Sequence, residues 1–102
     1  MRFEGKVKSV GMQQHDPNGK WTRTPVEVSW KEEFANAEPV EHSLLAVCFQ
    51  PINMEELMKA VNEQKDVVFF IYVNVSRGVS KKTGNPYEMN DVTIRFTSPI
   101  RA

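Results

Sequence analysis

The chain has 102 residues, which is enough for one domain, spanning residues 1–102, with a single compact core. Hydrophobic residues make up 40% and charged residues 25%, values typical of a soluble globular protein, so a disordered chain is excluded. Thirteen basic and thirteen acidic side chains give a formal net charge of zero. This balance argues against coating of duplex DNA through charge alone, although it allows a local basic patch.

One cysteine, Cys48, is present in the chain. It excludes an internal disulfide and argues against a cysteine-based zinc site, so we expect Cys48 to be a small buried residue. The start of the chain lacks the apolar region of a signal peptide, and the longest apolar run, residues 67–73, is far shorter than the roughly 20 residues that span a bilayer. We therefore expect a soluble, cytoplasmic protein.

The chain begins with an extended segment, from Arg2 to about Gln14, that is rich in β-forming residues. Its apolar alternation changes phase near residues 9–11, which predicts a bulge or a sharp bend there. A strong turn signal, HDPNGK, follows at residues 15–20.

The second extended segment runs from Trp21 to about Glu33. It places Val26, Val28 and Trp30 on one face, so we expect Trp30 in the core. Pro25 cannot donate to a ladder and therefore indicates an edge position or a bulge.

Residues 36–42 have the composition of a loop, and His42 to Gln50, apolar on both phases, reads as a short buried strand. The following stretch, residues 51–64, is the only good helical pattern, with Asn53 as a plausible N-cap.

Two further strands follow, from Val67 to Arg77 and from Tyr87 to Thr97. In the first, the alternate residues from Val67 to Val75 form an apolar phase that we expect to face the core. For Phe70 and Tyr72, on the other phase, we expect a second core layer; the alternative is an exposed or dimer-forming face.

This order, three strands, a helix and two strands, predicts a mainly β protein: a five-stranded OB-fold-like barrel with one helix between strands 3 and 4. The bent first strand fits such a barrel because it can pair on both sides. An open α+β sheet with one covering helix is the alternative.

Signals for catalysis are weak. His15 and His42 lie in different predicted loops, outside any metal-binding or nucleophile motif, and no glycine-rich stretch resembles a phosphate-binding loop. We therefore expect neither an enzyme nor a cofactor or metal site.

Signals for binding are stronger, because cations stand beside aromatic residues in both loops that flank the binding face of an OB fold. Cations can follow phosphates while aromatic rings stack on unpaired bases. The alternative is that the lysines only solvate a hairpin and that the two aromatic rings cap the barrel ends. Taken together, the set predicts a nucleic-acid-binding face formed by Lys20, Trp21, Arg23, Arg77, Lys81, Lys82 and Tyr87.

The stretch SRGVSKKTGNPYEMND, residues 76–91, resembles the DNA-binding hairpin of the filamentous-phage single-stranded DNA-binding proteins. In that family the basic residues and the tyrosine of the hairpin contact DNA, which implies this role for Arg77, for Lys81 or Lys82, and for Tyr87. The family has its hairpin near the N-terminus rather than after a helix. The overall layout is more similar to the bacterial single-stranded DNA-binding proteins and the primosomal replication protein, which implies a role in DNA replication.

We therefore expect non-catalytic binding of single-stranded nucleic acid, either DNA or RNA with DNA favoured, by a homo-oligomer, a dimer or a tetramer. The alternative from a different class is an OB-fold protein-interaction module, favoured by the zero net charge and by the acidic stretch KEEFANAEPVE, residues 31–41. An oligosaccharide binder that stacks aromatic rings on sugars is a third possibility.

Overall fold

A computed structural model describes residues 1–102, apart from the side chains of Met89 and Asn90. The elements, in chain order, are β1 (Arg2–Val10), β2 (Gln14–His15), β3 (Thr22–Phe34), β4 (Ala37–Cys48), α1 (Met54–Asn62), β5 (Val67–Val79) and β6 (Pro86–Phe96).

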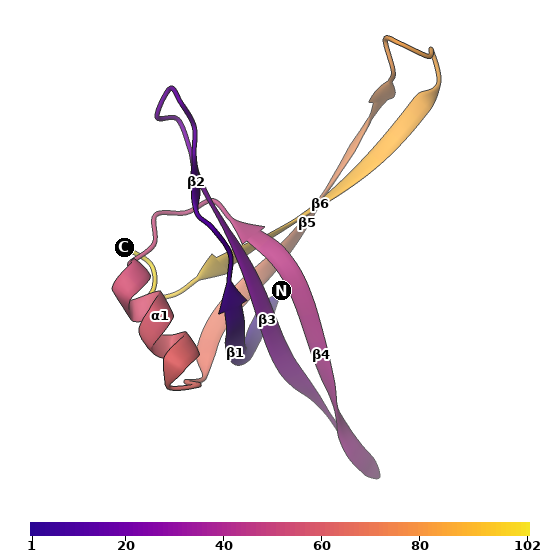
Figure 1. The fold of residues 1–102 in the computed structure, drawn as a ribbon. Coiled ribbons are helices and arrows are strands. Elements are labelled where there is room, and N and C mark those ends of the chain that lie inside the picture. The colour runs from indigo at the N-terminus through magenta and orange to yellow at the C-terminus, as the bar shows by residue number, and fades with distance from the viewer.

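Five of the strands close into a barrel in the order β1-β5-β6-β4-β3, and β1 pairs with β3 to complete the circle. All neighbours are antiparallel except β4 and β6, which run parallel at Val47 and Thr93. The predicted OB-fold-like barrel is confirmed, with its helix between the third and fourth barrel strands, β4 and β5 (Figure 1). The open sheet is excluded, because β1 and β3 pair.

Strand β1 pairs on both sides because it bends at Gly5. Residues 2–5 pair with β5 and residues 6–10 with β3, and the register shifts between Val7 and Ser9, as the phase change predicted. A Cβ atom at Gly5 would lie 2.0 Å from the carbonyl oxygen of Ser29. Only glycine allows β1 and β3 to approach this closely, so Gly5 permits the barrel to close.

The core lies inside the barrel and under α1. Its fully buried side chains include Phe69, Ile94 and Leu57, and Cys48 is buried among them, as predicted. Trp30 packs against this core, also as predicted. Asn53 is the N-cap of α1: its side chain accepts a hydrogen bond from the backbone N–H of Glu56 (3.3 Å).

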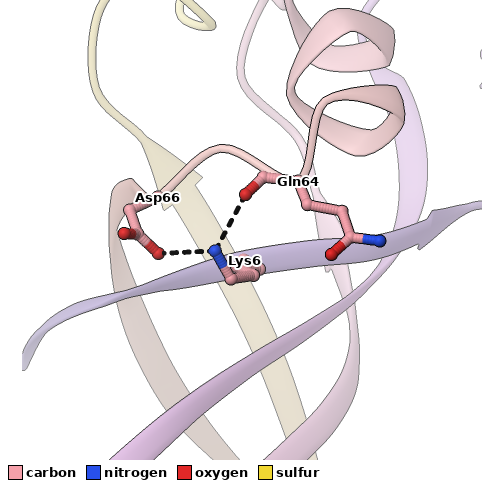
Figure 2. A network of polar contacts seen from close by, with 3 residues as sticks. All are labelled: Lys6, Gln64 and Asp66. Atoms are coloured by element: carbon pink, nitrogen blue, oxygen red, sulfur yellow. Dashed lines mark hydrogen bonds and ion pairs between the residues drawn. The ribbon is translucent and has the colours of Figure 1, made fainter.

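The carboxyl end of α1 is tied to β1 by a lysine. The Lys6 ammonium donates to the carbonyl oxygen of Gln64 (2.8 Å) and contacts Asp66 Oδ1 (3.0 Å), as Figure 2 shows. Gln64 has a φ of 51°, the left-handed conformation that often ends a helix. This contact holds the helix across one end of the barrel.

Three expectations were wrong. Residues 36–42 are not a loop: from Ala37 onward they belong to β4, which pairs with β3 as far as Phe34 and forms one long hairpin. Tyr72 is not a core residue, because its side chain is 45% exposed. The inward phase of the fourth barrel strand does not extend to Val75, because β5 leaves the barrel beyond Ile71.

Beyond the barrel, β5 and β6 continue as a two-stranded projection, which we call the arm (residues 73–92). It extends well away from the barrel in Figure 1. Its strands pair as far as Val79 with Pro86, and the tip is formed by residues 80–85.

Candidate nucleic-acid interface

The hairpin between β2 and β3 is folded tightly around Asp16. The Asp16 carboxylate accepts hydrogen bonds from the backbone N–H groups of Asn18 (3.3 Å) and Lys20 (3.1 Å). The backbone N–H of Asp16 donates to the carbonyl of Trp21 (3.0 Å). Gly19 supplies the positive φ, 72°, that the turn requires. These bonds define where Lys20 and Trp21 project from the barrel.

Trp21 contacts a second aromatic residue, Phe49, which is not among the site residues predicted from the sequence. The two rings meet edge to face with centroids 6.5 Å apart, and the side chains remain 43% and 49% exposed. Buried aromatic pairs add stability, whereas rings half in solvent offer a free face for another flat group. Phe49 points away from the core because the adjacent Cys48 points into it.

Gln50 fixes the chain immediately after Phe49. Its side-chain amide donates to the carbonyl of Phe96 (3.1 Å), and its Oε1 accepts the Phe96 N–H. The Gln50 side chain thus pairs with both main-chain groups of Phe96, as the backbone of a neighbouring strand would. This double contact holds the exit of β4 next to β6 and keeps Phe49 at the surface.

A cleft of about 570 Å³ adjoins Phe49. Two arginines line it, Arg95 on β6 and Arg101 near the C-terminal end, and Asn74 of β5 contributes from the arm. None of the described side chains that line it is acidic. The cleft therefore combines a half-exposed ring with two positive charges.

The wall that carries Arg101 is built by main-chain pairing. Ile52 and Arg101 form an antiparallel bridge, the Asn53 N–H donates to the carbonyl of Ile100 (2.7 Å), and the Ala102 N–H donates to that of Pro51 (3.1 Å). Residues far apart in sequence thus meet beside the cleft.

The cleft lies on an outward surface that crosses four strands. Pro25 pairs with Val47, Val47 with Thr93, and Thr93 with Tyr72, so these residues form one row on the outside of β3, β4, β6 and β5. In the next row Arg95 stands opposite Phe70. Arg23 is exposed on the side of β3 opposite buried Thr24, and hence on this same surface.

The tip of the arm presents Lys81 and Lys82 to solvent. The Ser80 hydroxyl accepts the N–H groups of Lys82 (3.3 Å) and Thr83 (3.4 Å), while Gly84 adopts a φ of 71°. Neither lysine forms an ion pair with any described side chain. Their charges are therefore available to an anionic ligand.

Tyr87 and Arg77 lie on opposite faces of the arm. Tyr87 pairs with Gly78 and its ring covers that glycine: a Cβ atom there would lie 2.7 Å from the Tyr87 hydroxyl. Arg77 is opposite Glu88, and its Nε donates to Glu88 Oε2 (3.2 Å). The cation of Arg77 is thus partly neutralised and is on the face that Tyr87 does not share.

The predicted site residues consequently fall into separate groups. The β2–β3 hairpin carries Lys20, Trp21 and Arg23, of which Trp21 contacts Phe49 at the edge of the cleft. Lys81 and Lys82 lie at the far end of the arm. Both hairpins project from the same side of the barrel and diverge (Figure 1). Three further residues of this surface were not predicted from the sequence: Phe49 directly after β4, Arg95 on β6 and Arg101 in the C-terminal segment.

Two other features lie away from this surface. A cavity of about 810 Å³ is lined by residues of β1, β3, β4 and the end of α1, among them Lys8 of β1 and Glu41 of β4, which form an ion pair (2.9 Å). The hydrogen bond between them lowers the pKa of the Glu41 carboxyl and raises that of the Lys8 ammonium. Burial raises the pKa of the Cys48 thiol.

Among the described residues, no three side chains of the His, Cys, Asp or Glu types gather as a metal site would require. Within the same residues, no helix has the length and apolar character needed to cross a membrane. No protein-family model matches the sequence, and a search of curated proteins finds no significant match.

Proposed function

We propose that the chain binds single-stranded nucleic acid, without catalysis, across the outward surface of β4, β6 and β5. One observation carries this proposal. The half-exposed rings of Trp21 and Phe49 stand beside a cleft that holds Arg95 and Arg101 and has no acidic side chain among its described lining residues. Unpaired bases stack on aromatic rings, and arginines bind the phosphates between them.

The zero net charge of the chain supports a local rather than a global electrostatic attraction. None of Arg23, Arg95 or Arg101 is in an ion pair with a described side chain. A strand that enters beside Arg23 would pass the two rings and then the cleft. Base stacking is worth about 1–3 kcal/mol per base, so two rings suffice for affinity in the absence of a strongly basic chain.

The arm extends the same surface. Asn74 lines the cleft. Gly78 is four positions further along β5 and therefore on the same face as Asn74, and Tyr87 is paired with Gly78, so Tyr87 lies further along this face of the arm. Lys81 and Lys82 at the tip would contact the phosphates of a longer strand. This division of roles differs from the hairpin resemblance in one respect: Arg77 is directed to the other face.

A titration with oligo-dT at two salt concentrations, followed by tryptophan fluorescence, tests the proposal. We expect quenching of Trp21 and an affinity that falls as salt rises, because bound phosphates release counterions. Trp21→Phe should remove most of the quenching, since Trp30 packs against the core. Parallel titration with oligo-rU distinguishes DNA from RNA preference. Absence of binding to both strands at low salt would refute the proposal.

The alternative, a protein-interaction module, is favoured by the hairpin of β3 and β4. Residues 31–41 are all exposed, and they carry four glutamates but only one lysine. Phe34 and Val40 are 47% and 46% exposed within this acidic segment. A basic partner with an apolar pocket would fit it. A variant that has lost oligonucleotide binding but still binds a basic protein partner through this hairpin would favour this alternative.

We further propose kinship with the single-stranded DNA-binding OB-fold proteins, including a role in DNA replication. The closed barrel and the sequence GVSKKTGNPY of the arm, residues 78–87, support it. From this kinship we expect the chain to bind single-stranded DNA more tightly than duplex DNA of the same length in solution.

A further inference from the structure

The two faces of the arm differ in chemistry. Alternate residues of a strand point to opposite faces. One face carries Asn74 and Tyr87 and continues the surface of the cleft. The other we call the valine face; among the described side chains it carries Val73, Val75, Arg77 and Val79 of β5 and Pro86, Glu88 and Val92 of β6.

The valine face exposes several apolar side chains to solvent. Val73, Val75 and Val79 are 61%, 52% and 64% exposed. Strand β1 pairs with β5 only at residues 67–70, and β4 pairs with β6 at Thr93. Within the arm, the outer edges of β5 and β6 therefore have no strand partner among the described residues. A two-stranded ribbon is marginally stable in water unless its apolar face is covered. Three aligned valines on such a ribbon therefore indicate a surface that another molecule covers.

The valine face carries one positive and one negative side chain, so it can be complementary in charge to the same face of a second copy. Arg77 and Glu88 stand side by side, on neighbouring strands, with their side chains 3.2 Å apart. If a second copy packs face to face about a two-fold axis along the arm, β5 of one copy lies over β6 of the other. Arg77 of each copy then lies opposite Glu88 of the other, flanked by valines on both sides.

We infer that the valine face is a self-association surface whose partner is a second copy of this chain. The interface is isologous: Val73 and Val79 pack against Val92 and Pro86 of the other arm, and two Arg77–Glu88 contacts set the register. A face two strands wide is small for an interface, so the dimer forms in a concentration-dependent manner. The inference does not depend on nucleic-acid binding, because the cleft and Tyr87 use the opposite face.

Sedimentation equilibrium without nucleic acid tests this inference. The wild-type chain should dimerise as concentration rises, and a Val73→Thr/Val75→Thr variant should remain monomeric. Threonine keeps the β-branched shape that the strand favours, so the arm should still fold. Val40→Thr, the same change at an exposed valine of the β3–β4 hairpin, is the matched control and should dimerise normally.

Charge exchange tests the register. Arg77→Glu and Glu88→Arg should each weaken self-association at least tenfold, since each places like charges opposite one another. A mixture of these two variants should form heterodimers, because the faces are then oppositely charged. Local damage to the arm cannot explain that rescue. A wild-type chain that is monomeric at its highest soluble concentration overturns the inference, and so does a dimer that the valine changes leave intact or a mixture that fails to associate.

Discussion

The change of Phe49 to Ala is the sharpest probe of the proposed surface, because Phe49 contacts Trp21 and lines the cleft at once. A stacked base contributes about 1–3 kcal/mol to binding, and a tenfold change in Kd corresponds to about 1.4 kcal/mol. Only one side of the Phe49 ring is open, since the side chain is 49% exposed and its other contacts are within the protein. We therefore expect the lower part of this range, a loss of affinity of about fivefold to tenfold.

The assay is the oligo-dT titration at low salt, with urea unfolding of the same samples. Phe49→Leu retains apolar bulk without a stacking face and should lose nearly as much affinity as Phe49→Ala. Phe34→Ala is a matched control, because Phe34 has almost the same exposure, 47%, at the tip of the β3–β4 hairpin. It should leave affinity unchanged. Equal affinity of the Phe49→Ala and wild-type chains, or an equal loss in Phe34→Ala, would refute the reasoning.

Three further results are expected. Changing Lys81 and Lys82 together to Ala should reduce the slope of log Kd against log salt by about 1.4, since a single strand contributes about 0.7 for each phosphate contact; an unchanged slope would exclude the arm tip from binding. Gly5→Ala should destabilise the chain by about 3 kcal/mol in urea unfolding, because its Cβ would collide with the carbonyl of Ser29; an unchanged midpoint would contradict the bend. Cys48 should resist a thiol reagent until the chain unfolds, and rapid labelling of the native chain would contradict its burial. The free energy of unfolding should also fall as pH rises above about 8.5, because the thiol of the unfolded chain then ionises while the buried thiol keeps its proton.

The sequence contained enough information to predict the barrel because its local signals agree. The phase change near Ser9, the turn around Asp16, the Asn53 cap and the apolar alternation of the strands each favour the same order of elements. Such agreement between local and global preferences is what specifies a fold.

Where prediction failed, the deciding contacts are between distant residues or depend on where the barrel ends. Val73 and Val75 have the same alternation as Phe69, yet they are exposed because β1 no longer pairs with β5 at that point. Residues 37–42 have loop-like composition, yet pairing with the preceding strand draws them into β4. Tyr72 faces outward because its phase belongs to the outer row with Thr93.

The candidate site could be predicted only in part, for the same reason. Trp21 stands in a turn that local residues define, so its projection from the barrel could be inferred. Phe49 joins it through the β3–β4 register, and Arg95 and Arg101 join through the parallel contact of Val47 and the bridge at Ile52. The outward position of Phe49 next to an inward Cys48 was the one available signal.

Amide chemical-shift mapping with oligo-dT tests the central claim most directly, because it locates the ligand on the surface without any substitution. We expect saturable shift changes concentrated at residues 20–23, 49–51, 93–95 and 101, weaker changes at the arm tip, and none at residues 31–41. Changes confined to residues 31–41, or no saturable change at low salt, would contradict the account.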